Sequence, residues 1–478
     1  MSRSANSYDF VVLGGGSAGY AAARTARDLG LKTAVVEGGE HVGGLCILRG
    51  CMPTKALLET AHRFHEIRNA SEFGLRVGSA KVDWKKVVSR KDRLIEDFAS
   101  YRRGQLKSGE FDFFRAYGAF ADAHTLNLTP VGASEEKVPR SIKSKTFLIA
   151  TGSRITPPPV PGLEAVKYLT SDDAIHLTKP PKSLIVLGGG PIAIEFADYF
   201  QKMGVQVTLL QRSLHILKNH DEDVASEVEQ AFRDSGMKVI TGTRLIRAAV
   251  VGKNKVVYYE QQGKSKQVRA KEILYALGRE PNTLGLNLQA AGVKLRQKTI
   301  RINRQMQTNQ PHIFAAGDVS GPYEIVHVAI QQGEVAANNA AVHLGESKIK
   351  PKTMDYRVPM EVVFSQPEVA SVGLNEKAAK SSGKDVISAS YPFNDHGKSM
   401  IMGAKFGFVK CIADRKSGRI VGAQIVGPNA SDLIHEFAVA ITLRITVEKF
   451  LQVPHYHPTL AEIVTYPVEE IAEKLGRI

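Results

Sequence analysis

Residues 10–19 read FVVLGGGSAG, and residues 184–193 read LIVLGGGPIA. In each stretch a short apolar run meets a glycine turn, and a helical pattern follows. A second apolar run completes each unit, at residues 32–36 and at residues 206–210. Strand–turn–helix–strand units of this kind build parallel sheets. The sequence therefore predicts an α/β fold that contains two Rossmann-like dinucleotide-binding domains.

The first glycine turn fits the pattern GxGxxG. Such a turn lets the backbone approach a pyrophosphate and places that group on a helix N-terminus. Glu37 ends the next apolar run, where a carboxylate can accept hydrogen bonds from an adenine ribose. Because the turn follows a strand pattern and opens a helix pattern, a dinucleotide site is favoured over a purely structural turn. The candidate residues are Gly14, Gly16, Ser17, Ala18, Gly19 and Glu37.

The second glycine turn has Ala193 in the place of the last glycine, a replacement that the pattern tolerates. Gln211 and Arg212 stand where the first unit has Glu37. A carboxylate would repel a ribose 2′-phosphate, whereas arginine and lysine attract it, so NADPH is slightly favoured over NADH. The alternative is that these cations are ordinary solvated side chains. The candidate residues are Gly188, Gly190, Pro191, Ile192, Gln211, Arg212, Lys218 and Gly278.

Residues 43–55 read GGLCILRGCMPTK and contain a pair of cysteines, Cys46 and Cys51. Pro53 suits the first turn of a helix, because its missing N–H is not needed there. Cys51 is then expected at a helix N-terminus, where the helix dipole favours a thiolate, and Cys46 is expected on the extended side, free to attack a substrate. A zinc site would need two further ligands nearby, and buried structural thiols are the other alternative. The pair is interpreted as a redox-active disulfide, and no metal site is expected.

Residues 454–462 read PHYHPTLAE. Imidazole has an ordinary pKa of about 6.5, so it can carry a proton near neutral pH. A carboxylate bound to its other nitrogen would orient the ring and favour its protonated form. Thiol–disulfide exchange needs such a group to protonate the leaving thiolate. His457 and Glu462 are therefore the candidate acid–base pair, against the alternative of a helix start, while His455 is a neighbour and Cys411 a core residue.

Together these segments resemble the class I pyridine nucleotide–disulfide oxidoreductases, over about residues 8–475. The resemblance implies that FAD is the cofactor, that Cys51 faces the flavin and that Cys46 exchanges with the substrate. It implies a homodimer in which His457 enters the active site of the other subunit. Arg49 departs from the family pattern, and a shifted redox potential, an anionic substrate or no role at all would each be compatible with it. Further residues implied by the resemblance are Gly44, Ala150, Thr151, Gly152, Gly317 and Asp318 for FAD, and the pair Lys55 and Glu195 beside flavin and nicotinamide.

The resemblance and the breaks at proline-rich stretches together suggest four domains. These are an FAD-binding domain (1–158), an NAD(P)-binding domain (159–280), a central domain completing the FAD site (281–350) and an α+β C-terminal dimerisation domain (351–478). Within the family, the tail most resembles dihydrolipoamide dehydrogenases, with a lipoyl-type dithiol as substrate. An NADPH-dependent reductase of glutathione or another small disulfide is the alternative. A non-catalytic flavin-binding interaction protein is the alternative from another class.

Composition indicates which partners and which cellular location to expect. The 478 residues carry a formal net charge of +15, but the basic residues are spread out, so nucleic acid is not an expected partner. No apolar run reaches the roughly 18–20 residues that span a bilayer, so no membrane association is expected. Three cysteines are few for a secreted protein stapled by disulfides. With a short polar N-terminus that does not look like a signal peptide, the expected location is the cytoplasm.

Overall fold

The computed structural model describes residues 6–108, 110–132 and 138–478. Residues 1–5, which belong to the polar N-terminus considered above, lie outside the described residues. The chain folds into two compact units, each assembled from three separate segments. Unit 1 comprises residues 1–53, 90–156 and 279–355, and unit 2 comprises residues 54–89, 157–278 and 356–478. The four domain boundaries expected from the sequence stay a prediction.

Unit 1 is built on a mixed sheet whose parallel strands include the first predicted one. The central strand β1 (Ser7–Leu13) pairs in parallel with β2 (Thr33–Val36) and with β6 (Ser141–Ile149). β18 (Ile313–Ala315) pairs in parallel with the end of β6. A strand buried on both faces must be apolar throughout, and the run from Phe10 to Leu13 satisfies this condition. The other strands of the sheet are β3 (Asp112–Phe114), β4 (Ala116–Phe120) and β5 (Thr125–Pro130).

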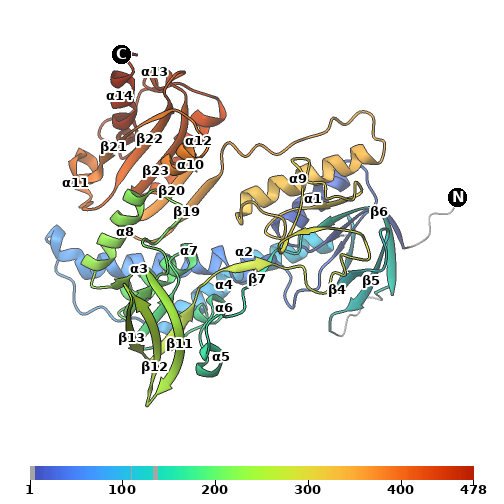
Figure 1. Ribbon diagram of the computed structural model, residues 1–478, viewed down its shortest axis with the longest axis horizontal. Coiled ribbons are helices and arrows are strands. Elements are labelled where there is room, and N and C mark those ends of the chain that lie inside the picture. Colours follow the sequence, from blue (N-terminus) through green and yellow to red (C-terminus); the bar gives the residue numbers. More distant parts are fainter. Residues whose placement is uncertain (1–5, 109, 133–137) are drawn as a thin grey trace. The chain divides into compact units, whose positions relative to one another are not determined.

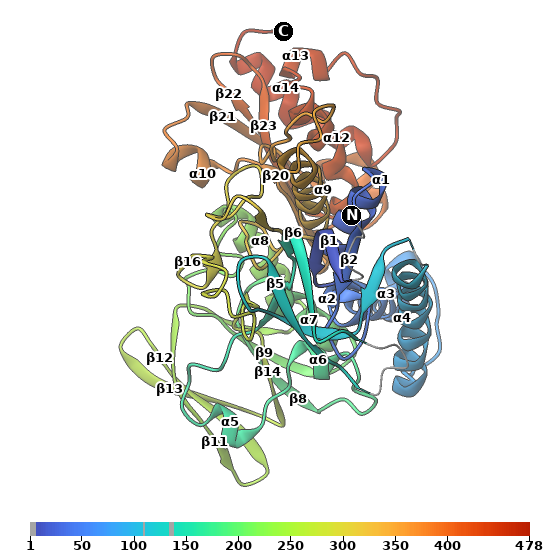
Figure 2. The same cartoon turned by 90° about the vertical axis from the view of Figure 1, so that its right-hand side faces the viewer.

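Two helices of unit 1 lie side by side, although they are far apart in the sequence. α1 (Ser17–Asp28) follows the first glycine turn, and α9 (Val326–His343) runs along it (Figure 1). The buried faces of both helices are rich in alanine, and small side chains allow two helix backbones to approach closely. Figure 2, which is turned by 90°, shows α9 together with β1, β2 and β6.

Unit 2 contains the second predicted strand–turn–helix–strand unit. Its four strands are all parallel, in the order β10 (Lys238–Ile240), β9 (Gln206–Leu210), β8 (Ser183–Leu187) and β14 (Glu272–Tyr275). The helices α7 (Pro191–Lys202) and α8 (Glu222–Asp234) contribute Phe196, Phe200 and Phe232 to one hydrophobic core. The part of α3 (Cys51–Asn69) that belongs to unit 2 adds Leu57 and Leu58 to the same core. The α/β fold with two Rossmann-like units is thus confirmed.

Two antiparallel sheets complete unit 2. The first has the strands β11 (Thr243–Val251), β12 (Asn254–Gln261) and β13 (Lys264–Ala270), and the sequence reasoning did not predict it. The second has the order β19 (Met360–Val363), β20 (Glu368–Gly373), β23 (Ile420–Gly427), β22 (Phe408–Asp414) and β21 (Val386–Pro392). α12 (Ala430–Thr442) and α14 (Thr465–Lys474) pack against the second sheet, which gives the α+β character expected of the C-terminal region.

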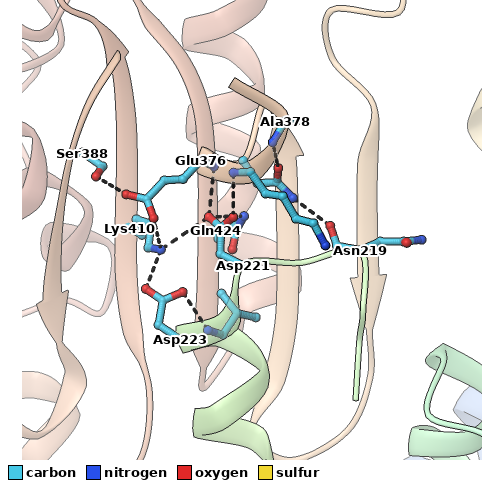
Figure 3. A network of polar contacts seen from close by, with 11 residues as sticks. Asn219, Asp221, Asp223, Glu376, Ala378, Ser388, Lys410 and Gln424 are labelled. Atoms are coloured by element: carbon cyan, nitrogen blue, oxygen red, sulfur yellow. Dashed lines mark hydrogen bonds and ion pairs between the residues drawn. The ribbon is translucent and has the colours of Figure 1, made fainter. Parts of the chain in front are cut away.

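A buried lysine joins α8 to this second sheet. Lys410, on β22, forms ion pairs with Asp221, Asp223 and Glu376 (Figure 3), and its side chain is only 4% exposed. Gln424, on β23, also donates a hydrogen bond to Asp221, at 3.0 Å. Burial acts against the charged form, but the three carboxylates outweigh it and raise the pKa of Lys410. The cluster fixes the start of α8 on the antiparallel sheet by charge.

The remaining elements are short or connect the units described above. None of the helices among the described residues is long and apolar enough to cross a membrane. These elements are η1 (Ala70–Phe73), α2 (Gly44–Leu48), α4 (Trp84–Lys107), β7 (Ser153–Ile155), α5 (Leu163–Val166), α6 (Ser171–Ala174), β15 (Arg279–Pro281), β16 (Leu295–Arg296), β17 (Thr299–Ile300), α10 (Glu376–Ser381), η2 (Phe393–Asp395), α11 (Gly397–Ile401), α13 (Val447–Phe450) and η3 (Ala461–Val464).

Candidate active site

The first glycine turn has the close backbone approach that the sequence pattern predicts. Gly14 has a φ of +103°, and a Cβ there would lie 2.4 Å from the carbonyl oxygen of Ala150. Glu37, at the end of β2, accepts hydrogen bonds from the backbone N–H groups of Gly15 (2.7 Å) and Gly39 (2.6 Å). Among the described residues no side chain caps α1, which begins after Gly16. Its first N–H groups are therefore available to an anionic group.

Three predicted segments meet at one edge of the sheet of unit 1. The glycine turn follows β1, Ala150-Thr151-Gly152 follows β6, and Gly317-Asp318 comes shortly after β18. Because these strands are parallel and adjacent, their carboxyl ends point to the same edge. Asp318 accepts a hydrogen bond from Ser153 Oγ at 2.6 Å. Burial, together with the charge of Asp318, raises the pKa of nearby Glu324.

The cysteine segment packs onto the glycine turn. A Cβ at Gly44 would lie 2.7 Å from the Cα of Gly16, so the two backbones are in direct contact. Cys51 is exposed and is the first residue of α3, as predicted. The expectation of an extended Cys46 is wrong: Cys46 is half-buried in the five-residue helix α2. Gly43 and Gly44 both have positive φ, and the chain turns into the helix at these two residues.

A cation that the sequence reasoning missed acts on the same region. Arg102, on α4, lies over the ring of Tyr20 at 4.0 Å. Burial lowers the pKa of the Arg102 guanidinium, while Tyr20 and Cys46 are among the groups that raise it. Its signal in the sequence was a pair of arginines on a helix, which is typical of any solvated face.

The predicted pair Lys55 and Glu195 is formed in unit 2. Lys55 Nζ lies 2.8 Å from both carboxylate oxygens of Glu195, on α7. Glu195 is buried, and it also accepts a hydrogen bond of 3.0 Å from the backbone N–H of Phe364. Lys55 Nζ lies 4.7 Å from the centre of the Phe364 ring. Phe364 therefore helps to position the pair through its backbone, which no side-chain motif could have indicated.

The predicted acid–base pair is also formed. His457 Nδ1 lies 3.1 Å from each oxygen of Glu462, and the His457 side chain is 80% exposed. Glu462 is buried and receives a second imidazole, since His396 Nε2 lies 3.1 Å from Glu462 Oε1. Burial acts to raise the pKa of Glu462, but hydrogen bonds from His457 and His396 outweigh it and hold this pKa below its ordinary value. His455 contacts Glu436 at 2.9 Å instead.

The second glycine turn again leads into a helix without a side-chain cap in the part of the chain that the structure describes. Gly190 precedes α7, and Pro191 is its first residue, followed by Ile192. Gln211 is buried against the turn, where its amide donates to the His215 carbonyl at 3.3 Å. Arg212 and Lys218 are exposed. Gly278, with a φ of +124°, follows β14, which neighbours β8.

Two further questions from the sequence concern a metal site and the third cysteine, Cys411. Within the described ranges, no group of three or more histidine, cysteine or acidic side chains could hold a metal ion. Cys411 is buried in β22, and burial raises the pKa of its thiol, so it remains a protonated core residue. Cys46 and Cys51 stay the cysteines that the sequence predicts to be redox-active.

Comparison with known proteins decides the family. The family model described as pyridine nucleotide-disulphide oxidoreductase matches residues 8–333, and the model for its dimerisation domain matches residues 359–467. The chain belongs to the pyridine nucleotide-disulphide oxidoreductase family. It is accordingly an FAD-dependent oxidoreductase that uses a pyridine nucleotide and acts on sulfur groups. Family membership sets aside the alternative of a non-catalytic flavin-binding protein.

Relatives of this oxidoreductase cover nearly its full length. It is 34% identical to the dihydrolipoyl dehydrogenase of Bacillus subtilis, over 96% of this chain and 97% of the relative. It is 33% identical to the mercuric reductase of Staphylococcus aureus, over 95% of this chain and 81% of the relative. The crystal structure of LpdA from Mycobacterium tuberculosis matches with a TM-score of 0.85 and 26% identity, covering 97% of this chain and 99% of LpdA.

The residues of the disulphide oxidoreductase fit the cofactor that the family requires. The sheet edge of unit 1 offers an uncapped helix N-terminus, a turn without side chains at Gly14 and Gly16, and carboxylates at Glu37 and Asp318. A dinucleotide needs donors for its pyrophosphate and acceptors for its sugar hydroxyls, and this set supplies both.

Proposed function

We propose that this oxidoreductase exchanges electrons between a nicotinamide dinucleotide and a lipoyl-type dithiol through Cys46 and Cys51. The observation that carries the proposal is the exposed imidazole of His457, held by the buried carboxylate of Glu462. Such a dyad is what thiol–disulfide exchange requires of a protein, in addition to two neighbouring sulfurs. Relatives named dihydrolipoyl dehydrogenase, at 34–36% identity over nearly the whole chain, support the choice of substrate.

FAD, when bound, accepts a hydride from the nicotinamide and exchanges two electrons with a disulfide. In the proposal its adenosine and pyrophosphate are bound by the first glycine turn and Glu37, and its ribityl chain by Asp318. Gly44 and the segment Ala150-Thr151-Gly152 line the same sheet edge. The buried carboxylate of Glu195 keeps the Lys55 ammonium in place, and the proposal assigns this pair to the flavin and nicotinamide, as the resemblance implies.

The protein's own steps can be written with balanced bonds. In the reducing direction, the Cys46 thiolate attacks one sulfur of a substrate disulfide, which forms a mixed disulfide and releases a thiolate. His457 gives that thiolate a proton. The Cys51 thiolate then attacks the Cys46 sulfur and breaks the mixed disulfide, which releases the second substrate sulfur as a thiolate that takes a proton from water and leaves a Cys46–Cys51 disulfide. Oxidation of a dithiol runs through the same steps in reverse, with His457 Nε2 accepting the proton of the second substrate thiol.

The proposal includes a homodimer with a shared active site. A matched dimerisation domain covers His457 and its surroundings. The outward position of the imidazole, with 80% of its side chain exposed, supports a role in the active site of the second subunit. The cytoplasmic location expected from the sequence stays a prediction.

A steady-state panel tests the proposed substrate. It crosses NAD⁺/NADH and NADP⁺/NADPH with dihydrolipoamide, lipoamide and oxidised glutathione, using holoenzyme with bound FAD. We expect the highest kcat/KM with the lipoamide couple. Higher kcat/KM with oxidised glutathione would favour the alternative of a small-disulfide reductase. No turnover with any of these disulfides would reject the proposal.

The nucleotide preference rests on the loop after β9. Gln211 replaces the acid that would repel a 2′-phosphate, and the two exposed cations Arg212 and Lys218 can attract it. This composition favours NADPH, and it is the observation that keeps the small-disulfide reductase as a second candidate function.

Charge reversal at Arg212 tests the nucleotide preference. Arg212→Glu should raise KM for NADPH by roughly tenfold or more and leave KM for NADH within a factor of about two, because only NADPH carries the phosphate that this cation would bind. Arg233→Glu, at a partly exposed arginine on α8, is the control. Equal kinetic effects of Arg212→Glu on both nucleotides would contradict NADPH preference.

A further inference from the structure

Glu462 lies between two imidazoles in unit 2, and only one of them was predicted. His457, the exposed member, contacts both carboxylate oxygens at 3.1 Å. His396, which stands between η2 and α11, contacts Oε1 at 3.1 Å. The His396 side chain is fully buried, with 0% exposure, against 80% for His457. The two rings therefore differ in what they can do: one can reach a substrate and the other cannot.

The hydrogen bonds of His396 assign its proton. Its Nε2 faces a carboxylate, which accepts, so Nε2 carries the hydrogen. Its Nδ1 lies 2.7 Å from Ser399 Oγ, and the hydroxyl can donate to that nitrogen. Ser399 is itself fully buried. Ser399 thus donates a hydrogen bond to His396, and His396 donates one to Glu462.

Packing holds the His396 ring in the orientation that these hydrogen bonds need. The His396 and Tyr466 rings pack edge to face, at a centroid distance of 5.9 Å and an interplanar angle of 73°. Tyr466 in turn stacks on Tyr391 at 4.3 Å, and the Tyr391 hydroxyl lies 3.1 Å from Asp395, the residue before His396. A ring with these contacts and no exposed surface has little freedom to rotate.

We propose that His396 is a positioning residue, which fixes the Glu462 carboxylate and thereby the ring of His457. The inference rests on the proposed function, because it assigns His396 a purpose only if His457 transfers protons. A carboxylate that receives one N–H from a rigid ring cannot change rotamer without losing it. With Glu462 fixed, Nδ1 of His457 is held and its Nε2 is presented outward. Ser399 acts one step further back, by holding the ring of His396.

Two substitutions at His396 distinguish the loss of its hydrogen bond to Glu462 from the loss of its side-chain volume. His396→Leu removes both ring nitrogens, whereas His396→Gln keeps a side-chain N–H that can reach Glu462. In the dithiol–disulfide reaction of the holoenzyme, we expect His396→Leu to lower kcat roughly tenfold, a part of the roughly 10²–10⁴-fold that general acid–base catalysis contributes. KM for the nucleotide should stay at its wild-type value. His396→Gln should recover most of the lost kcat, which a merely structural loss would not show.

Two further variants control the experiment. His220→Leu removes another buried imidazole of unit 2, whose Nε2 lies 3.8 Å from Glu361, and should keep wild-type kcat. In a double-mutant cycle, His396→Leu should cause no further loss of kcat when it is added to His457→Gln, because the ring that it positions is already gone. Should His396→Leu fail to fold, Ser399→Ala decides, with an expected smaller loss of kcat in the same direction.

The outcomes distinguish this inference from the proposed function. If His457→Gln abolishes turnover while His396→Leu, or Ser399→Ala in its place, turns over like wild type, His396 has no positioning role. Independent, additive losses in the double mutant would also overturn the inference. If His457→Gln itself retains wild-type turnover, the proposed function fails first, and the inference fails with it.

Discussion

Cys51 occupies the first residue of α3, where the N–H groups of the helix favour a negative charge. A thiolate in this position is both a good electron donor and a good leaving group. Cys51→Ser should keep bound FAD, because the glycine turn and Glu37 are untouched, but it should lower disulfide turnover by at least about 10³-fold. The flavin absorbance of the purified protein and a steady-state assay measure the two effects. Cys411→Ser, at the core cysteine of β22, is the control and should keep turnover.

The carboxyl group of Glu462 makes a pH-dependent contribution to stability. Its pKa is lower in the folded protein than in the unfolded chain, chiefly because two imidazoles donate to it against the effect of burial. A lowered carboxyl pKa stabilises the fold above the unfolded value, and this stabilisation is lost as pH falls through the folded value. Glu462→Gln should therefore unfold at a lower Tm than wild type at neutral pH, with the difference shrinking on acidification. A Tm difference that is constant with pH would contradict the sign.

At this scale the sequence predicted the residues that belong to contiguous motifs. Cys51, His457 and Glu462 were found because each stands in a short pattern whose local chemistry is readable. His396 was not found, because its purpose depends on a carboxylate 66 positions away. Cys46 was placed wrongly, because the conformation of this five-residue helix depends on the positive φ of Gly43, which precedes it, and of Gly44, which begins it.

Among the elements, α8 is attached to the antiparallel sheet by the cluster around Lys410 (Figure 3). Removing the cation leaves Asp221, which is buried, without its ion-pair partner. Lys410→Met should lower the free energy of unfolding by about 3–5 kcal/mol, the usual cost of breaking a buried pair from one side. Lys405→Met is the matched control: it breaks the exposed pair with Glu72 and should cost less than about 1 kcal/mol. Urea unfolding curves of both variants make the comparison.

How well an element could be predicted depends on how far apart in the chain its pairing partners lie. The strand–turn–helix–strand units were predicted because their pairing partners lie close in the chain. β18 joins the first sheet beside β6, and no local pattern could indicate a pairing across that separation. The sheet of β11, β12 and β13 was missed, because its strands do not show a clean alternation of apolar and polar residues. The pairing register of β11 shifts between Leu245 and Arg247, and β13 carries three cations among its seven residues.

For the whole molecule, the proposed homodimer makes each active site depend on two chains. A chain with Cys51→Ser and a chain with His457→Gln would each be inactive as homodimers. Co-expressed, they should form heterodimers in which one of the two sites has both an intact Cys51 and an intact His457. Random assembly then predicts about a quarter of wild-type activity. Activity no higher than that of the separate mutants would show that each chain uses its own His457.

The pairing of β18 with β6 also has a consequence for the order in which the protein can be made. While the chain emerges from the ribosome, Ile149 appears well before Ile313, and most of unit 2 up to Gly278 is synthesised in between. At roughly 5–20 residues per second the wait is on the order of ten seconds or more. During it the end of β6 has no neighbour on that side, and its apolar edge must be kept from other nascent chains. The sheet whose first strand is synthesised earliest is thus among the last to be completed.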